Sequence, residues 1–142
     1  MTFFLAVMDP EKEQFRCVNA GHGRPYLLLP TVSAQPDERA QFALTPVGLQ
    51  TSAPLGYDRG TAYSGVETHP WPVGAKLFLY TDGLIDSENF GRNKLRKTIA
   101  ANGQLNARAL LSKIMQEHRG ATPGIAQLDD ITVVICESVV EV

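Results

Sequence analysis

The residues of this 142-residue chain best suited to chemistry are three aspartates in two places. Asp82 follows the apolar run Leu77–Tyr80 and precedes a glycine. The pair Asp129-Asp130 precedes the apolar run Ile131–Cys136. A buried strand fixes the backbone at its end, so a carboxylate placed there is delivered to the rim of a sheet. Each place also has a plainer interpretation, because Asp-Gly after a strand signals a turn and acids before a strand are often solvated.

Together the aspartates favour a metal site. Neighbouring carboxylates repel one another unless a cation lies between them. Magnesium and manganese prefer oxygen ligands, so a set of aspartates without His or Cys fits these ions better than zinc. Asp82 and Asp129 are the main candidate ligands. Asp130 is a further candidate, either as a ligand or as support for its neighbour, and Asp86 is either an extra ligand or part of a solvated helix start.

The composition is that of an ordinary globular domain, with 44% hydrophobic residues, 20% charged residues and a net charge of −2. The chain is long enough for one domain with a core of its own. It has no basic excess of the kind that binds nucleic acid, and no apolar run approaches the roughly 20 residues that span a bilayer. We therefore expect neither nucleic acid nor membrane as a partner.

The sulfur and imidazole side chains do not suggest a site. Cys17 and Cys136 lie in apolar runs without Cys-x-x-Cys or Cys/His spacing, which predicts two buried free thiols in a reducing, cytoplasmic environment. His69 lies in a proline-flanked segment expected to be a loop, and His118 lies on the apolar stripe of a predicted helix. Neither histidine has partners at ligand spacing.

The first half of the chain reads as strands. Runs at Phe3–Met8, Gln14–Asn19 and Tyr26–Leu29 with short links predict an antiparallel meander. A polar surface loop is expected over Pro30–Pro46, holding a short strand near Gln41–Leu44. An exposed strand is predicted over residues 61–68.

The second half adds helices. Leu95 and Ile99 predict a helix that stops near Asn102-Gly103. Asn106 is placed to cap a second helix, whose stripe recurs at i, i+3, i+4 and i+7. A strand from Ile131 then closes the fold, so an α+β domain is the predicted class.

Four motifs in order carry a family resemblance. They are Asn19-Ala20-Gly21-His22 with Pro25 behind it, Pro54-Leu55-Gly56, Leu79-Tyr80-Thr81-Asp82-Gly83-Leu84, and Asp129-Asp130-Ile131-Thr132. With them the chain resembles the metal-dependent PPM or type 2C protein phosphatases over almost its whole length. Within that family it is most similar to the bacterial branch typified by stage II sporulation protein E and the stress-response sigma-factor regulators.

The resemblance implies a sandwich of two antiparallel sheets flanked by helices, with two manganese or magnesium ions held by aspartates at one end. Asp82 and Asp129 fall on the family's metal ligands and are the implied catalytic residues. The implied reaction is hydrolysis of phosphoserine or phosphothreonine on a regulatory protein, an anti-sigma-factor antagonist being one candidate substrate. Water activated by two metals performs this chemistry without a covalent intermediate.

One family element has no counterpart. The family carries a Gly-Asp motif whose aspartate bridges both metals, and this chain has no Gly-Asp dipeptide. We therefore expect residues 1–142 to be a single, incomplete, N-terminally truncated phosphatase domain, with poor or single-metal occupancy and little activity alone. Exposed sheet surface should then lead to self-association. The alternative is a catalytically inactive phosphatase-like module that binds a partner or relays a signal.

The remaining candidates are weaker. His22 lies between two glycines, and Arg24 follows closely, so both are candidates for binding a substrate phosphate. The resemblance instead makes Gly21 and His22 a structural turn, and a surface position explains Arg24 equally well. Gly56 and Gly83 are assigned to structural turns too.

Overall fold

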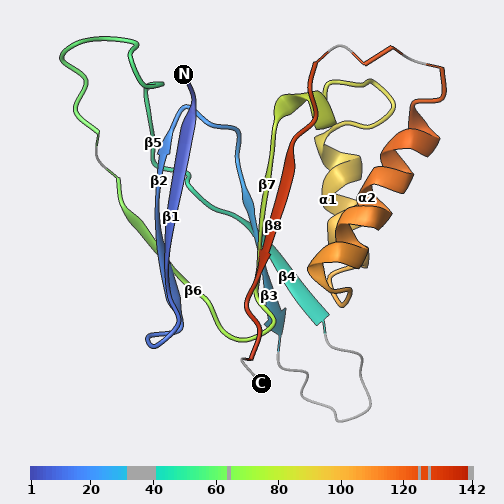
Figure 1. Cartoon of the computed structure of the whole chain (residues 1–142), viewed down its shortest axis with the longest axis horizontal. Coiled ribbons are helices and arrows are strands. Elements are labelled where there is room, and N and C mark those ends of the chain that lie inside the picture. Colours follow the sequence, from blue (N-terminus) through green and yellow to red (C-terminus); the bar gives the residue numbers. More distant parts are fainter. Residues whose placement is uncertain (32–40, 64, 125, 128, 141–142) are drawn as a thin grey trace.

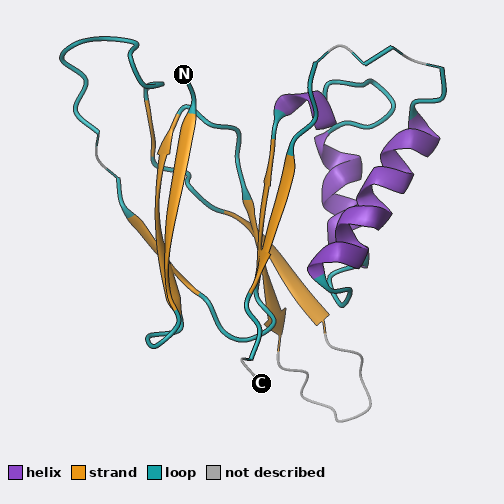
Figure 2. Cartoon of the chain, in the orientation of Figure 1, coloured by secondary structure: helices purple, strands orange, loops and turns teal. Residues whose placement is uncertain are grey.

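The structure, a computed structural model, describes residues 1–31, 41–63, 65–124, 126–127 and 129–140. Two β-sheets and a pair of helices form three layers, with the second sheet in the middle (Figures 1 and 2). The predicted α+β class is therefore confirmed. The helices lie on one side of the middle sheet only, so the order of the layers is sheet, sheet, helices.

The first sheet is built on an antiparallel hairpin of β1 (Phe3–Asp9) and β2 (Gln14–Ala20). The short strand β5 (Thr51–Ser52) pairs with β2 in parallel, and β6 (Glu67–Pro70) pairs with it in the antiparallel sense. The exposed strand predicted over residues 61–68 thus lies later in the sequence, at Glu67–Pro70. His69, expected in a loop, is a residue of this strand.

The second sheet has the order β4-β3-β7-β8, and all its neighbours are antiparallel. Its strands are β3 (Tyr26–Thr31), β4 (Gln41–Pro46), β7 (Lys76–Tyr80) and β8 (Val133–Glu137). The predicted meander is wrong, because β3 leaves the hairpin and enters this sheet. Tyr26, Leu27 and Leu28 are all buried, as a strand covered on both faces requires. Of the surface loop expected over residues 30–46, residues 32–40 lie outside the described residues.

Two helices cover the outer face of the second sheet. They are α1 (Arg92–Ala101) and α2 (Ala107–Ala121). The Asn106 side chain accepts a hydrogen bond from the Ala109 amide at 2.9 Å, so the predicted cap is confirmed. Among the described residues, no helix is long and apolar enough to cross a membrane.

The core consists of two apolar clusters on the two faces of the second sheet. Between the sheets pack Phe15, Cys17, Leu27, Val47, Trp71, Ala75 and Leu77. Between the second sheet and the helices pack Tyr26, Leu28, Phe78, Tyr80, Leu84, Phe90, Leu95, Ile99, Leu110 and Ile114. Alternate residues of the strands enter opposite clusters, which fixes the register of the sheet.

Within the part of the chain that the structure describes, no helix covers the outer face of the first sheet (Figure 1). Phe3, Leu5 and Val7 of β1 alternate with inward-facing residues and are 41%, 46% and 49% exposed. This alternation is typical of a strand with one face on the core and the other exposed to solvent. The exposed face of such a strand is usually polar, whereas here it is apolar.

Candidate functional site

Asp82 lies where β7 ends. The apolar residues of β7 enter the two cores, and the chain then forms a 3-10 turn over Asp82–Leu84. The Asp82 carbonyl accepts hydrogen bonds from the amides of Ile85 and Asp86, at 2.7 and 3.1 Å. Leu84 is fully buried, whereas Asp82 is exposed. Anchored on both sides, Asp82 is held at the rim of the sheet.

Asp129 and Asp130 lie beside this turn, because β7 and β8 are antiparallel and Tyr80 pairs with Val133. The residues that follow β7 therefore meet those that precede β8. Figure 1 shows the two segments together at one end of the second sheet. Asp129 and Asp130 are both exposed, as is Asp82.

Thr81 joins the two segments. Its hydroxyl donates to the Asp130 carbonyl at 3.0 Å and accepts from the Thr132 amide at 2.9 Å. Its own amide donates to the Thr132 carbonyl at 3.0 Å. Sequence reasoning gave Thr81 no role. Its position between a buried strand and Asp82 was the available signal, because a hydroxyl there satisfies backbone groups where the ladder ends.

Gly83 allows the close approach of the two segments. A Cβ added at this position would lie 2.6 Å from the carbonyl oxygen of Asp130 and 2.9 Å from that of Asp129. No side chain fits in this space. The glycine of the Asp-Gly pair is therefore required by contact with the second aspartate segment, and its φ is not in the left-handed region.

The Asp129 carboxylate is oriented by its own neighbour, since it accepts a hydrogen bond from the Asp130 amide at 2.7 Å. The Asp129 carbonyl accepts from the side-chain amide of Gln127 at 2.8 Å. Asp129 and Asp86 both line a cavity of about 340 Å³ beside the aspartate segments. Asp86 is exposed.

The end of α2 contributes to the same cavity, where His118, Arg119 and Thr122 are among the lining residues. The lining thus combines acidic residues with an arginine. Sequence reasoning placed His118 on a buried stripe and did not single out Arg119, since nothing in the local pattern shows that the end of α2 faces Asp129.

We call Asp82, Asp86, Asp129 and Asp130 the rim site. Its donors are carboxylate oxygens that water reaches, which is the chemistry that magnesium and manganese prefer. The donor set therefore fits these ions. The described residues contain one group of three potential ligand side chains whose atoms lie within 4.8 Å of one another, and it is not at the rim but at Cys17, Glu67 and His69.

His22 lies near the rim site without belonging to it. Asn19 holds the His22 turn by accepting from the His22 amide at 2.8 Å and donating to the His22 carbonyl at 3.1 Å. Burial lowers the pKa of His22, and the Asp82 charge partly offsets this. His22 and Thr81 line one cavity of about 240 Å³.

Arg24 is exposed. Gly21 has a φ of +73°, and a Cβ there would lie 2.6 Å from Pro54 Cγ. Gly56 has a φ of +77°. Both glycines therefore have a left-handed backbone conformation that other residues rarely adopt.

A family model described as stage II sporulation protein E (SpoIIE) matches residues 1–138. No curated protein matches the chain closely enough to be counted as a relative. Among solved structures, the manganese-presoaked phosphatase domain of SpoIIE from Bacillus subtilis is similar at 15% identity and a TM-score of 0.62, covering 99% of this chain and 58% of that one.

Two further structures are comparably similar. The SiaA-PP2C domain of Pseudomonas aeruginosa has 16% identity and a TM-score of 0.62, covering 94% of this chain and 50% of that one. A structure of RsbU and RsbW domains from Mycobacterium tuberculosis has 20% identity and a TM-score of 0.62, covering 97% of this chain and 36% of that one. The chain thus spans less than two thirds of each of these structures, and at these identities the likeness shows the fold.

Proposed function

Because the chain belongs to the SpoIIE family of PP2C-type phosphatase domains, we propose that it serves metal-dependent hydrolysis of phosphoserine or phosphothreonine on a regulatory protein. In this proposal the chain supplies the C-terminal part of the catalytic domain. The observation that carries it is the contact of Gly83 with the backbone of Asp129 and Asp130, which brings the two aspartate segments together.

Asp82 and Asp129 are the residues that would hold manganese or magnesium, with Asp130 and Asp86 as outer supports. A bound pair of metal ions supplies an activated water and neutralises charge on the phosphoryl group. The chain's own part is to fix the carboxylates. Thr81 joins their two segments, and the Asp130 amide orients the Asp129 carboxylate. Two main ligands without a bridging carboxylate support weak or single-metal binding.

The cavity of about 340 Å³ is the proposed place of the phosphorylated side chain. Arg119 at the end of α2 would bind the phosphate, since a guanidinium pairs with phosphate oxygens through two parallel hydrogen bonds. His22 and Arg24 are secondary candidates. An anti-sigma-factor antagonist is the proposed substrate, on the resemblance alone, and the proposed location is the cytoplasm, which suits two free cysteines.

One observation favours the alternative of an inactive module. Among the described residues, no three carboxylates of the rim site have oxygens within 4.8 Å of one another. A module of this kind would keep the fold and bind a partner without turnover.

Manganese binding decides between these two functions. Electron paramagnetic resonance of free Mn²⁺ during titration of the chain should show weak binding that Asp82→Asn and Asp129→Asn each remove. Glu11→Gln changes the same charge on the exposed turn between β1 and β2, at the opposite end of the sheets, and should keep the binding (Figure 1). If the wild-type chain binds no manganese at millimolar concentration, or if Asp82→Asn keeps the binding, the enzyme proposal is wrong.

Turnover tests the proposal that the chain is part of a domain. The isolated chain should hydrolyse an aryl phosphate or a phosphopeptide at close to the background rate with manganese present. Manganese-dependent turnover that Asp82→Ala abolishes would contradict the need for a further segment, while supporting the rim site.

We also propose self-association of the isolated chain through the first sheet. Among the described strands, β1 pairs with β2 alone, so its other edge is open. The apolar side chains Phe3, Leu5 and Val7 lie beside this edge. A second copy that pairs with β1 would continue both the ladder and the apolar face. Light scattering should show a dimer that Leu5→Lys shifts to monomer, and a wild-type monomer at high concentration would contradict this.

A further inference from the structure

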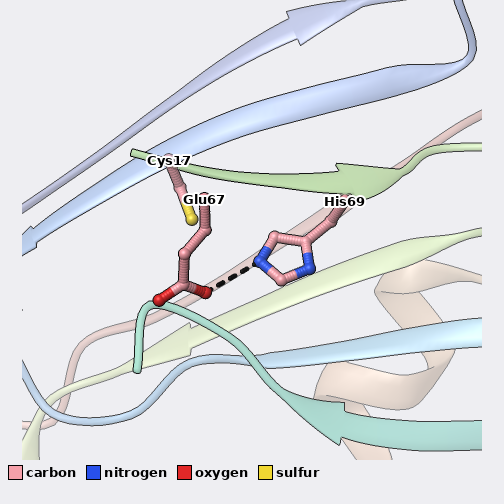
Figure 3. A group of neighbouring side chains, drawn as sticks. All are labelled: Cys17, Glu67 and His69. Carbon is pink, nitrogen blue, oxygen red and sulfur yellow. Dashed lines mark hydrogen bonds and ion pairs between the residues drawn. The ribbon is translucent and has the colours of Figure 1, made fainter. Parts of the chain in front are cut away.

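Three side chains of different chemistry meet on the inner face of the first sheet (Figure 3). Cys17 of β2 pairs directly with Glu67 of β6, and Phe15 pairs with His69. Residues two apart on a strand face the same way, so the pairing brings Cys17, Glu67 and His69 to one face. Their ligand atoms all lie within 4.8 Å of one another. We call these three residues the strand cluster.

The strand cluster is held in place by its surroundings. Glu67 Oε2 accepts hydrogen bonds from the Gly48 amide at 2.9 Å and from His69 Nε2 at 3.0 Å. Glu67 Oε1 accepts from the Gln50 amide at 2.6 Å. The His69 ring lies 5.2 Å from that of Phe15, between centroids. Neither the carboxylate nor the imidazole can move far without losing these contacts.

Cys17 belongs to the apolar core between the sheets and is 2% exposed. Burial, with a further effect of the Glu67 charge, raises the pKa of its thiol to about 11. Without a metal the thiol is therefore protonated. An ordinary buried cysteine faces apolar neighbours, whereas this one faces a carboxylate and an imidazole, each of which is also a metal ligand.

We propose that Cys17, Glu67 and His69 bind a zinc ion. A thiolate with an imidazole selects zinc over magnesium and manganese, and a carboxylate completes a three-ligand set that leaves one position for water. On binding, the Cys17 thiol gives its proton to solvent and a zinc–sulfur bond forms. The hydrogen bond from His69 Nε2 to Glu67 is lost: the imidazole proton moves to Nδ1, and Nε2 and the carboxylate each form a bond to the metal.

The distances suit this exchange. Zinc–sulfur bonds of about 2.3 Å and zinc–nitrogen bonds of about 2.0 Å separate tetrahedral ligand atoms by about 3.5 Å. Glu67 Oε2 and His69 Nε2, now 3.0 Å apart, must separate slightly, and the distances from Cys17 Sγ, now within 4.8 Å, must close by about 1.3 Å at most, which rotation of the Cys17 side chain provides. The amides of Gly48 and Gln50 continue to orient the carboxylate, as hydrogen-bonded partners of zinc ligands do.

Bound zinc would tie three segments together. It would join β2 to the edge strand β6, and through Glu67 it would hold the residues at Gly48 and Gln50. Gly48 in turn accepts a hydrogen bond from Asn19, the residue that holds the His22 turn, at 2.9 Å. The proposed role is therefore to stabilise this part of the first sheet, and it does not depend on the proposed function of the rim site.

The test uses the reduced, chelator-treated chain. Calorimetric titration should give one tightly bound zinc per chain, and zinc should raise the Tm, since a ligand of the folded state stabilises it. Cobalt in place of zinc should give a charge-transfer band from thiolate to metal. If the folded wild-type chain binds no zinc, or if the cobalt complex lacks the thiolate band, the proposal is wrong.

Matched variants locate the site. Cys17→Ser and His69→Gln should each weaken zinc binding more than about 100-fold, since losing even a partner of a ligand costs about 10- to 100-fold. Cys136→Ser, the other free cysteine, and Asp82→Asn at the rim should keep wild-type affinity. His69→Gln keeps a donor for Glu67, so it remains informative if Cys17→Ser does not fold. Wild-type affinity in either ligand variant overturns the proposal.

Discussion

The rim site and the strand cluster place potential metal ligands in opposite settings. The rim carboxylates follow or precede strands, are exposed, and are held through backbone contacts at Thr81 and Gly83. The strand cluster lies within two paired strands, faces the core, and is held through hydrogen bonds to the ligand side chains themselves. At the rim the backbone is fixed and the Asp129 carboxylate accepts one hydrogen bond from the Asp130 amide, whereas in the strand cluster the side chains themselves are fixed by several contacts.

This difference has energetic consequences. A free, solvated carboxylate contributes little to stability, so it can be kept for chemistry. A carboxylate that accepts three hydrogen bonds near the core is part of the folded structure, because its removal leaves donors without partners. The same substitution should therefore destabilise the chain much more at the strand cluster than at the rim site.

The largest expected effect compares two carboxylates truncated to alanine. Glu67→Ala should lower the free energy of unfolding by about 2 to 4 kcal/mol, because the amides of Gly48 and Gln50 lose their acceptor. Asp82→Ala should change it by less than about 0.5 kcal/mol, because Asp82 is exposed. Urea unfolding followed by circular dichroism, with a chelator present, measures both.

Glu67→Gln is the matched control for this pair of substitutions. It keeps one acceptor oxygen and removes the charge, so its effect should lie between those of the two alanine variants. If Glu67→Ala is no more destabilising than Asp82→Ala, the two sites do not differ in the way described.

An intermediate effect is expected at Gly83. The Cβ of Gly83→Ala would meet the Asp130 carbonyl at 2.6 Å, so the two rim segments must separate, at a cost of about 1 to 3 kcal/mol. Manganese binding at the rim should weaken, whereas zinc binding at the strand cluster should not change. Unfolding and metal titrations measure these effects separately.

Gly120→Ala is the control for Gly83→Ala. Gly120 lies in α2, and a Cβ there meets nothing within 4 Å. The change should stabilise the chain by about 0.5 to 1 kcal/mol, because alanine is the better helix former. A Gly83→Ala variant as stable as Gly120→Ala would show that the rim segments are not in close contact.

The two sites also differ in what the sequence could reveal. Asp82 and Asp129 lie near apolar runs, but that local pattern also fits a plain turn, and the resemblance carried by four ordered motifs made them candidate ligands. The antiparallel pairing of β7 and β8 brings their two segments together. The strand cluster has no local pattern. Cys17 and Glu67 meet only because of the register between β2 and β6, and the sequence placed His69 in a loop.

The fold also has features that local sequence pattern predicts and features that it does not. The strand runs at the start of the chain, the closing strand and the capped α2 were predicted from period and capping, which are local properties. The assignment of β3 to the second sheet was not predicted, because it depends on which faces are covered. Lys76 shows this dependence too. Lys76 carries a charge, yet its side chain is only 2% exposed at the start of β7. It forms an ion pair with Glu137 at 3.2 Å and donates a hydrogen bond to the Gly103 carbonyl at 3.1 Å.

The smallest expected effect is a change in how stability depends on pH near neutrality, caused by a histidine beside the rim site. His118 lines the cavity beside the rim site and packs edge-on against Phe90, with ring centroids 5.2 Å apart. Burial lowers the pKa of His118 below its ordinary value of 6.5, and the charge of Arg119 lowers it further. The unfolded chain therefore binds this proton more readily than the folded chain, and stability is lost as pH falls below about 6.5.

His118→Gln should remove this part of the pH dependence. Between pH 7.5 and pH 5.5 the variant should lose less stability than the wild type, by less than about 1 kcal/mol, because solvent screens a partly exposed group. Chemical unfolding at the two pH values measures the difference. His22→Gln is the control, since burial lowers the pKa of His22 as well, and the Asp82 charge opposes that shift. Equal pH dependence in wild type and His118→Gln would show that the cavity wall at the end of α2 does not titrate in this range.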